Sequence, residues 1–164
     1  PTPLKVTKSN GELIDEVKFI LDLIAENDIV LSSGHLNISE IWPLFDEAKK
    51  RGVNRLLCNH PTYVIGASLD DITRLVSMGA YIEHSMCMFV QRSKYKFYEP
   101  DELDKMIKAA GVDKTILGSD LGQVGNPSPV DGFRGVINIC LELGYKENDI
   151  RKLISENASK LIGI

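Results

Sequence analysis

The stretch that decides the fold is Arg55-Leu56-Leu57-Cys58-Asn59-His60-Pro61. Its short apolar run predicts a strand that is buried on both faces, and the histidine and proline after it predict a turn. Three more short apolar runs occupy residues 29–31, 80–82 and 115–117. Longer amphipathic segments separate these runs, so the chain alternates between predicted strands and predicted helices. This alternation indicates an α/β fold with a parallel sheet and right-handed crossovers.

The predicted helices repeat apolar residues at three- and four-residue spacing. They cover about 11–27, 38–51, 69–78 and 100–110, and two more close the chain at about 130–143 and 146–162. No linker, charge block or low-complexity run divides the sequence. We therefore expect one domain over residues 1–164.

Polar side chains that can bind a metal or transfer a proton follow the predicted strands, at the point where each strand ends. They are His35, His60, Glu83 with His84, and Asp120. In parallel β/α folds, functional groups gather at the carboxyl ends of strands, so these residues are the candidates for a site. Every histidine of the chain is among them. Side chains alternate along a strand, so at most one of Glu83 and His84 is expected to face the site.

Two imidazoles and one carboxylate suit a divalent cation, with zinc expected first and manganese, iron or cobalt as alternatives. His35, His60 and Asp120 would leave a coordination position open for water, and Asp120 could also take a proton from that water. Simpler interpretations stay open. His35 could be a turn residue bonded to backbone, and Asp120 could cap a helix or order a loop.

Composition limits the function classes. The net charge of −4 gives no basic footprint for nucleic acid or an anionic membrane, so neither is an expected partner. Residues 91–98 mix basic and aromatic side chains, which fits a lid or anion-contacting loop, or a solvated loop, better than nucleic-acid stacking. Three widely spaced cysteines suggest neither a zinc knuckle nor a disulfide framework. With no signal-peptide pattern at Pro1 and no long apolar run, a cytoplasmic location is expected.

At these residues the chain resembles the amidohydrolase superfamily of metal-dependent hydrolases, especially its phosphotriesterase-like branch. The matching motifs are Leu31-Ser32-Ser33-Gly34-His35, Leu57-Cys58-Asn59-His60-Pro61, Gly79-Ala80-Tyr81-Ile82-Glu83, Ile116-Leu117-Gly118-Ser119-Asp120-Leu121-Gly122-Gln123 and Glu156-Asn157-Ala158-Ser159-Lys160-Leu161-Ile162-Gly163. Each motif is weak alone, and their order and spacing are more specific.

The resemblance implies the carboxyl-terminal half of a TIM barrel, with about four strands and closing helices. His35 and His60 would be metal ligands on the fifth and sixth strands, and Asp120 would bind metal and act as general base. Glu83, His84 and Gln123 are lesser candidates for substrate contact or for support of the ligands. The family's His-x-His pair is absent from this chain, and Lys5 or Lys8 lies only roughly where its bridging residue would be.

The expected function is hydrolysis of an ester, amide, lactone or related bond of a small molecule by metal-activated water. The alternative is a non-catalytic half-barrel, a fragment or interaction module with an incomplete site. A four-stranded parallel sheet has unpaired edges, so we expect association with a second copy or with a missing N-terminal half of the barrel.

Overall fold

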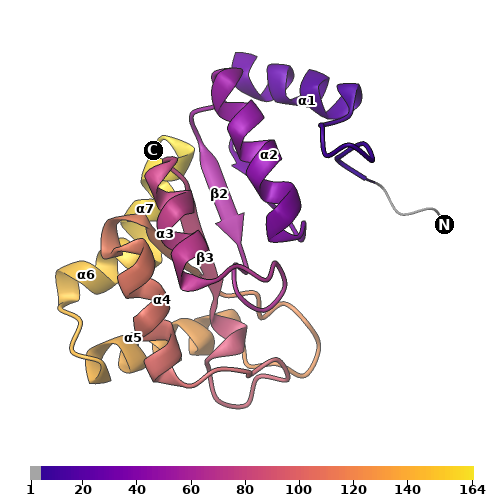
Figure 1. Ribbon diagram of the computed structural model, residues 1–164. Coiled ribbons are helices and arrows are strands. Elements are labelled where there is room, and N and C mark those ends of the chain that lie inside the picture. The colour runs from indigo at the N-terminus through magenta and orange to yellow at the C-terminus, as the bar shows by residue number, and fades with distance from the viewer. Residues whose placement is uncertain (1–4) are drawn as a thin grey trace.

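Four strands form a single parallel sheet in the computed structural model, which describes residues 5–164 (Figure 1). The strands are β1 (Leu31–Ser32), β2 (Leu56–Asn59), β3 (Tyr81–Ser85) and β4 (Thr115–Gly118). They pair in chain order, β1-β2-β3-β4, and all three pairings are parallel. The predicted fold class, α/β with a partial TIM-barrel-like sheet of four strands, is confirmed.

Helices lie between and after the strands. They are α1 (Asp15–Glu26), α2 (Ile38–Lys50), α3 (Leu69–Ser77), α4 (Pro100–Ala110), α5 (Pro129–Glu142), α6 (Glu147–Arg151) and α7 (Asn157–Ile162). Short 3-10 turns cover Met86–Met88 and Val112–Lys114. The predicted last helix is interrupted, because Lys152–Glu156 forms a π-helical turn between α6 and α7. None of the helices of the described residues is long and apolar enough to cross a membrane.

The helix starts follow from local chemistry. The Ser68 side chain accepts from the backbone N–H of Asp71, whose carboxylate in turn accepts from the Ser68 N–H, so a complete capping box begins α3. The Asn37 side chain accepts the Ser39 N–H at 3.0 Å, which fixes the start of α2. Pro100 occupies the first turn of α4, where its missing N–H costs no hydrogen bond.

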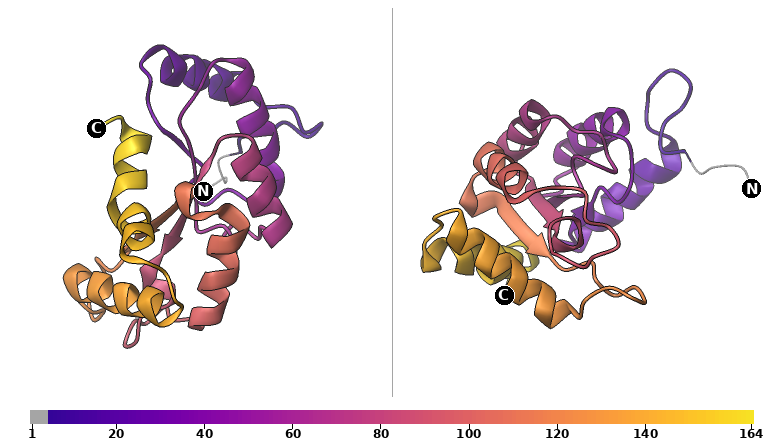
Figure 2. Two further views of the ribbon diagram at one scale, coloured as in Figure 1. Left: turned by 90° about the vertical axis from the view of Figure 1, so that its left-hand side faces the viewer. Right: turned by 90° about the horizontal axis from the view of Figure 1, so that it is seen from below.

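One face of the sheet packs against helices and carries most of the buried apolar side chains. Leu56, Cys58 and Ile82 on this face are at most 1% exposed and belong to a core that also includes Phe45 of α2 and Leu75 of α3. A second apolar cluster forms around α4, α5 and the π-helical turn. Figure 2 shows the helices arranged around the sheet, with α5 to α7 beside β4.

The opposite face and both edges of the sheet are less covered. Leu57, Asn59 and Tyr81 on that face are only half-buried, and Ser32 is exposed. Among the described residues, β1 pairs only with β2 and β4 pairs only with β3. This arrangement is that of a barrel wall without its other half, because a closed barrel has no sheet edges and covers its inner face.

All four strands point toward the same end of the molecule, which is the lower end in Figure 1 and faces the viewer on the right of Figure 2. The loops at 86–99 and 119–128 lie at this end, and so do the turns that follow β1 and β2. The predicted site residues therefore lie at one end of the fold, the end toward which the strands point.

Candidate functional site

The three main candidates, His35, His60 and Asp120, line one pocket of about 210 Å³ at the carboxyl ends of the strands. They follow β1, β2 and β4 respectively. The ring centroids of His35 and His60 are 5.1 Å apart, with an interplanar angle of 61°. Parallel pairing thus brings together side chains that are 25 and 60 residues apart in sequence.

His60 and Asp120 both adopt a left-handed backbone conformation, each with φ of 45°. Only two other non-glycine residues of the described chain, Asp28 and Arg92, have positive φ. His60 directly follows β2 and Asp120 is the second residue after β4, so each left-handed residue turns the chain just beyond a strand end. Such conformations carry a cost and cluster at functional sites, which favours a functional role for this pair.

A buried polar network contacts the Nδ1 side of the His60 ring. The Ser85 hydroxyl lies 2.8 Å from Nδ1 of His60 and 3.0 Å from Oε1 of Glu83. Asn59 Nδ2 donates to Oε2 of Glu83 at 3.3 Å. The backbone N–H of His60 donates to the Glu83 carbonyl at 3.2 Å. With Nδ1 engaged by Ser85, the Nε2 atom of His60 is left for a ligand.

The Glu83 carboxyl sits on the same face of the sheet as Asn59, its register partner on β2. Burial raises the pKa of this carboxyl, while nearby His60 and the hydrogen bonds from Ser85 and Asn59 oppose that rise. Space for Glu83 depends on Gly118, because a Cβ atom there would lie 2.5 Å from Oε1. Glycine at the end of β4 therefore leaves the space that the Glu83 carboxyl occupies.

Asp120 has two partners on its own side of the pocket. Gln123 Nε2 donates to Oδ1 at 3.2 Å, and the Cys87 thiol donates to Oδ2 at 3.6 Å. Burial, with the negative charge of Asp120, raises the pKa of Cys87 to about 12, so the sulfur remains a protonated donor at neutral pH. Both neighbours orient the carboxylate toward the space it shares with the histidines.

The donor set fits a divalent cation in part. His35 and His60 supply two imidazoles that face one pocket, which suits zinc and its neighbours in the first transition row. Within residues 5–164, however, no group of three His, Cys, Asp or Glu side chains lies close enough to hold a metal ion. Asp120 lines the same pocket without joining the histidine pair.

A model of the family of unknown function DUF6282 matches residues 1–83, which is just over half of the chain. The chain belongs to the DUF6282 family. The matched segment includes His35, His60 and Glu83, and Asp120 lies beyond it. Comparison with curated proteins found no match to this DUF6282 chain.

A solved structure shares the fold. It is the crystal structure of a protein from Pseudomonas putida that is named "Putative 2-Pyrone-4,6-Dicarboxylic Acid Hydrolase". It is 14% identical to the DUF6282 chain and superimposes with a TM-score of 0.60. The match covers 93% of the DUF6282 chain and 60% of the solved chain, so this chain spans less than two thirds of that structure.

The lesser candidates separate in the structure. Gln123 lines the pocket beside Asp120, and Glu83 lies behind His60. His84 projects from the opposite face of β3, is 2% exposed and is outside the pocket lining, so it is not placed in the site. This division follows the alternation expected along the strand. Lys8 is also outside the lining, and its Nζ lies 3.4 Å from Asp15 at the start of α1.

The mixed loop at 91–98 does reach the mouth of the pocket, but only with aromatic side chains. Tyr95 and Phe97 line the pocket. Lys94 Nζ donates instead to the Val124 carbonyl at 2.7 Å, and Lys96 Nζ pairs with Glu99. The expected anion contact from this loop is therefore not present at the candidate site.

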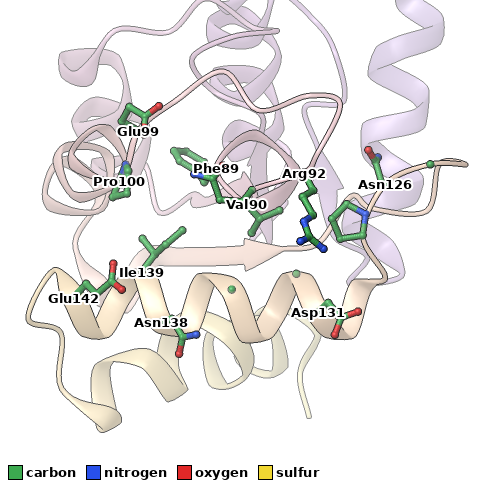
Figure 3. Close-up of a pocket in the computed structure, with 15 residues that line it drawn as sticks. Phe89, Val90, Arg92, Glu99, Pro100, Asn126, Asp131, Asn138, Ile139 and Glu142 are labelled. Carbon is green, nitrogen blue, oxygen red and sulfur yellow. The ribbon is translucent and has the colours of Figure 1, made fainter.

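A larger hollow lies elsewhere, between α5 and the segments around Phe89 and Glu99 (Figure 3). It measures about 650 Å³, and its charged groups, Arg92, Glu99, Asp131 and Glu142, are all exposed. Figure 3 shows them spread along the groove and not converging. It contains no histidine or cysteine, so strand-end chemistry favours the smaller pocket.

Sequence reasoning missed several residues that shape the site: Asn59, Tyr63, Ser85, Cys87 and Phe97. Asn59 and Ser85 share a sheet face with Glu83, and strand alternation could have grouped Glu83 with Ser85. Contacts from Tyr63 and Phe97 depend on loop conformation, for which the sequence offers no periodic signal.

Proposed function

We propose that this DUF6282 chain forms the carboxyl-terminal half of an amidohydrolase-type barrel and carries part of its hydrolytic site. The observation that carries the proposal is the convergence of His35, His60 and Asp120 from three strand ends on one pocket. The shared fold with a protein named as a hydrolase supports the same reaction class. The bond hydrolysed would be an ester, amide, lactone or related bond of a small molecule.

In this proposal His35 and His60 bind a divalent cation, zinc first, through their free ring nitrogens. When bound, such a cation lowers the pKa of a coordinated water and polarises the bond to be broken. The remaining protein ligands come from outside this chain, since within residues 5–164 only the histidine pair is brought together. Association with an N-terminal barrel half would supply them and would cover the two open sheet edges.

Asp120 acts as the general base. Its carboxylate faces the pocket, and Gln123 and Cys87 donate to separate oxygens, which fixes its orientation. A base held in this way takes a proton from attacking water and returns it to the leaving group. Ser85 and Glu83 keep the His60 ring in place, which holds its Nε2 atom in position for the cation.

The experiment that tests this proposal distinguishes the two metal-binding histidines from the general base, Asp120. Zinc affinity is measured by calorimetry for the chain and for His35→Ala, His60→Ala and Asp120→Asn, with Asp131→Asn as an exposed control. Each histidine variant is expected to bind zinc at least about ten-fold more weakly. Asp120→Asn is expected to keep most zinc affinity and to lower the turnover of the assembled protein by about a hundred-fold or more. Unchanged zinc affinity in both histidine variants would contradict the proposal.

The second candidate is a non-catalytic half-barrel that acts as an interaction module. It is favoured by one observation, the lack of a three-ligand group among residues 5–164. Under this alternative the chain still pairs with another barrel half, but neither Asp120→Asn nor the histidine variants alter any turnover of the assembled protein. Loss of turnover in Asp120→Asn excludes it.

A further inference from the structure

Four large apolar side chains at the candidate pocket are exposed to solvent. Tyr63 is 54% exposed, Phe97 49%, Tyr95 42% and Val64 37%, and all four line the pocket. They come from two segments, one after β2 and one after the 3-10 turn Met86–Met88. Exposed apolar groups that gather at a concave site are typical of ligand-binding surfaces.

The wall that these residues form is fixed in position. The rings of Tyr63 and Phe97 stack with centroids 4.2 Å apart and an interplanar angle of 18°. Backbone N–H groups of Phe97 and Tyr98 both donate to the Met88 carbonyl, at 3.0 and 3.1 Å. The buried Phe89 ring stacks on Tyr98 with centroids 5.6 Å apart, which anchors the segment from below. The stacked pair therefore lines the pocket as an aromatic wall that is already held in place.

Charge at the pocket is one-sided. Asp120 is the only carboxylate in the lining, and no lysine or arginine of the described residues lines it. Lys94 and Lys96 are directed to Val124 and Glu99, and Arg92 faces the separate groove of Figure 3. A charged group on a ring packed against Tyr63 and Phe97 would have no lysine or arginine of the lining beside it to offset its charge, which costs binding energy.

We infer that the pocket takes a small substrate with a neutral, flat aryl group, packed against Tyr63 and Phe97. Its scissile bond then faces His35, His60 and Asp120. This inference rests on the proposed function and specifies its substrate class. A pocket of about 210 Å³ has room for a single ring that carries a short carboxyl derivative.

The inference is tested by binding alone, without metal or turnover. Amide chemical shifts of the labelled chain are followed by NMR during titration with benzamide, with benzoate and with acetamide. Benzamide carries the neutral ring, benzoate adds a negative charge to it, and acetamide lacks it. Benzamide is expected to bind in the millimolar range and about ten-fold more tightly than either comparison compound.

Variants of Phe97 test whether the benzamide ring binds in this pocket. Phe97→Ala is expected to weaken benzamide binding about five-fold, since an aromatic pair contributes about 1 kcal/mol. Phe97→Leu keeps apolar bulk without the ring and is expected to fall in between. Phe19→Ala is the matched control, because Phe19 is 63% exposed on α1 and absent from the pocket lining. Backbone spectra check the folding of each variant.

Equal affinity for benzamide and benzoate, or unchanged benzamide affinity in Phe97→Ala, overturns the inference. Such a failure is distinguishable from failure of the proposed function. Normal zinc binding with no benzamide preference rejects only the aryl pocket. Benzamide binding that depends on Phe97, together with zinc affinity that ignores both histidines, rejects only the metal site.

Discussion

The Ser85 hydroxyl stands between Nδ1 of His60, at 2.8 Å, and the Glu83 carboxyl, at 3.0 Å. A hydroxyl has one hydrogen to donate. When Glu83 is ionised it takes that hydrogen, and Ser85 Oγ accepts from a protonated Nδ1. The bridge then selects one His60 tautomer and leaves the Nε2 lone pair free, which is the state that a metal ligand requires.

Ser85→Ala is expected to shift His60 toward the Nε2–H tautomer. Removing the hydroxyl deletes the acceptor for Nδ1–H and leaves Glu83 3.8 Å from that nitrogen, too far for a direct hydrogen bond. Long-range proton–nitrogen correlation spectra of histidine-labelled protein measure the tautomer. Ser77→Ala, on the exposed end of α3, is the control. An unaltered tautomer in Ser85→Ala would contradict the positioning role of the bridge.

Gly118→Ala is expected to displace Glu83 and to lower the free energy of unfolding by about 1–3 kcal/mol, as overpacking does. The new Cβ would lie 2.5 Å from Oε1 of a side chain that Ser85 and Asn59 hold in place. Gly122→Ala is the matched control, because nothing lies within 4 Å of a Cβ at that position. Chemical denaturation measures both variants, and equal stability losses would count against the clash.

The fold could be predicted, and so could the gathering of three candidate residues at one pocket, because both depend on repeating patterns. Apolar runs fix the strands, and parallel pairing brings their carboxyl ends together, which is why His35, His60 and Asp120 could be named from sequence. The supporting residues could not be, because Ser85 and Cys87 act through side-chain contacts that arise only after folding. Distances between strand ends depend on strand stagger, and no sequence pattern encodes whether Asp120 joins the histidine pair.

The buried histidine on the other face of β3 predicts a dependence of stability on pH. Burial lowers the pKa of His84 to about 4, below its ordinary value of 6.5. In the unfolded chain His84 therefore binds a proton as the pH falls through 6.5, whereas in the folded chain it binds that proton only near pH 4. Stability is full above pH 6.5 and is lost as the pH falls between these values, by about 3 kcal/mol for this group.

Urea denaturation at several pH values measures this loss, with His84→Leu as the comparison. Leucine binds no proton in either the folded or the unfolded state. The free energy of unfolding of this variant is therefore expected to fall by about 3 kcal/mol less than that of the unaltered chain between pH 6.5 and 4. Parallel pH profiles for the two proteins would show that His84 does not carry the dependence.

The closing helix is tied to β4 through one buried side chain. Asn157 is 0% exposed, and its Nδ2 donates to the carbonyls of Val112 and Thr115, each at 2.7 Å. The π-helical turn directly before it ends at Glu156. Because Thr115 opens β4, these bonds set the end of the strand opposite to the one that carries Asp120.

Asn157→Ala is expected to lower the free energy of unfolding by about 2–4 kcal/mol, since it deletes two hydrogen bonds and leaves buried carbonyls without a donor. Asn157→Asp keeps the shape but removes both donors and buries a charge, so it is expected to be at least as destabilising. Asn148→Ala, exposed on α6, is the control and is expected to change stability by less than about 0.5 kcal/mol. Thermal and urea unfolding measure all three, and a stability loss in Asn157→Ala no larger than that of the control would show that the helix is held by its apolar contacts instead.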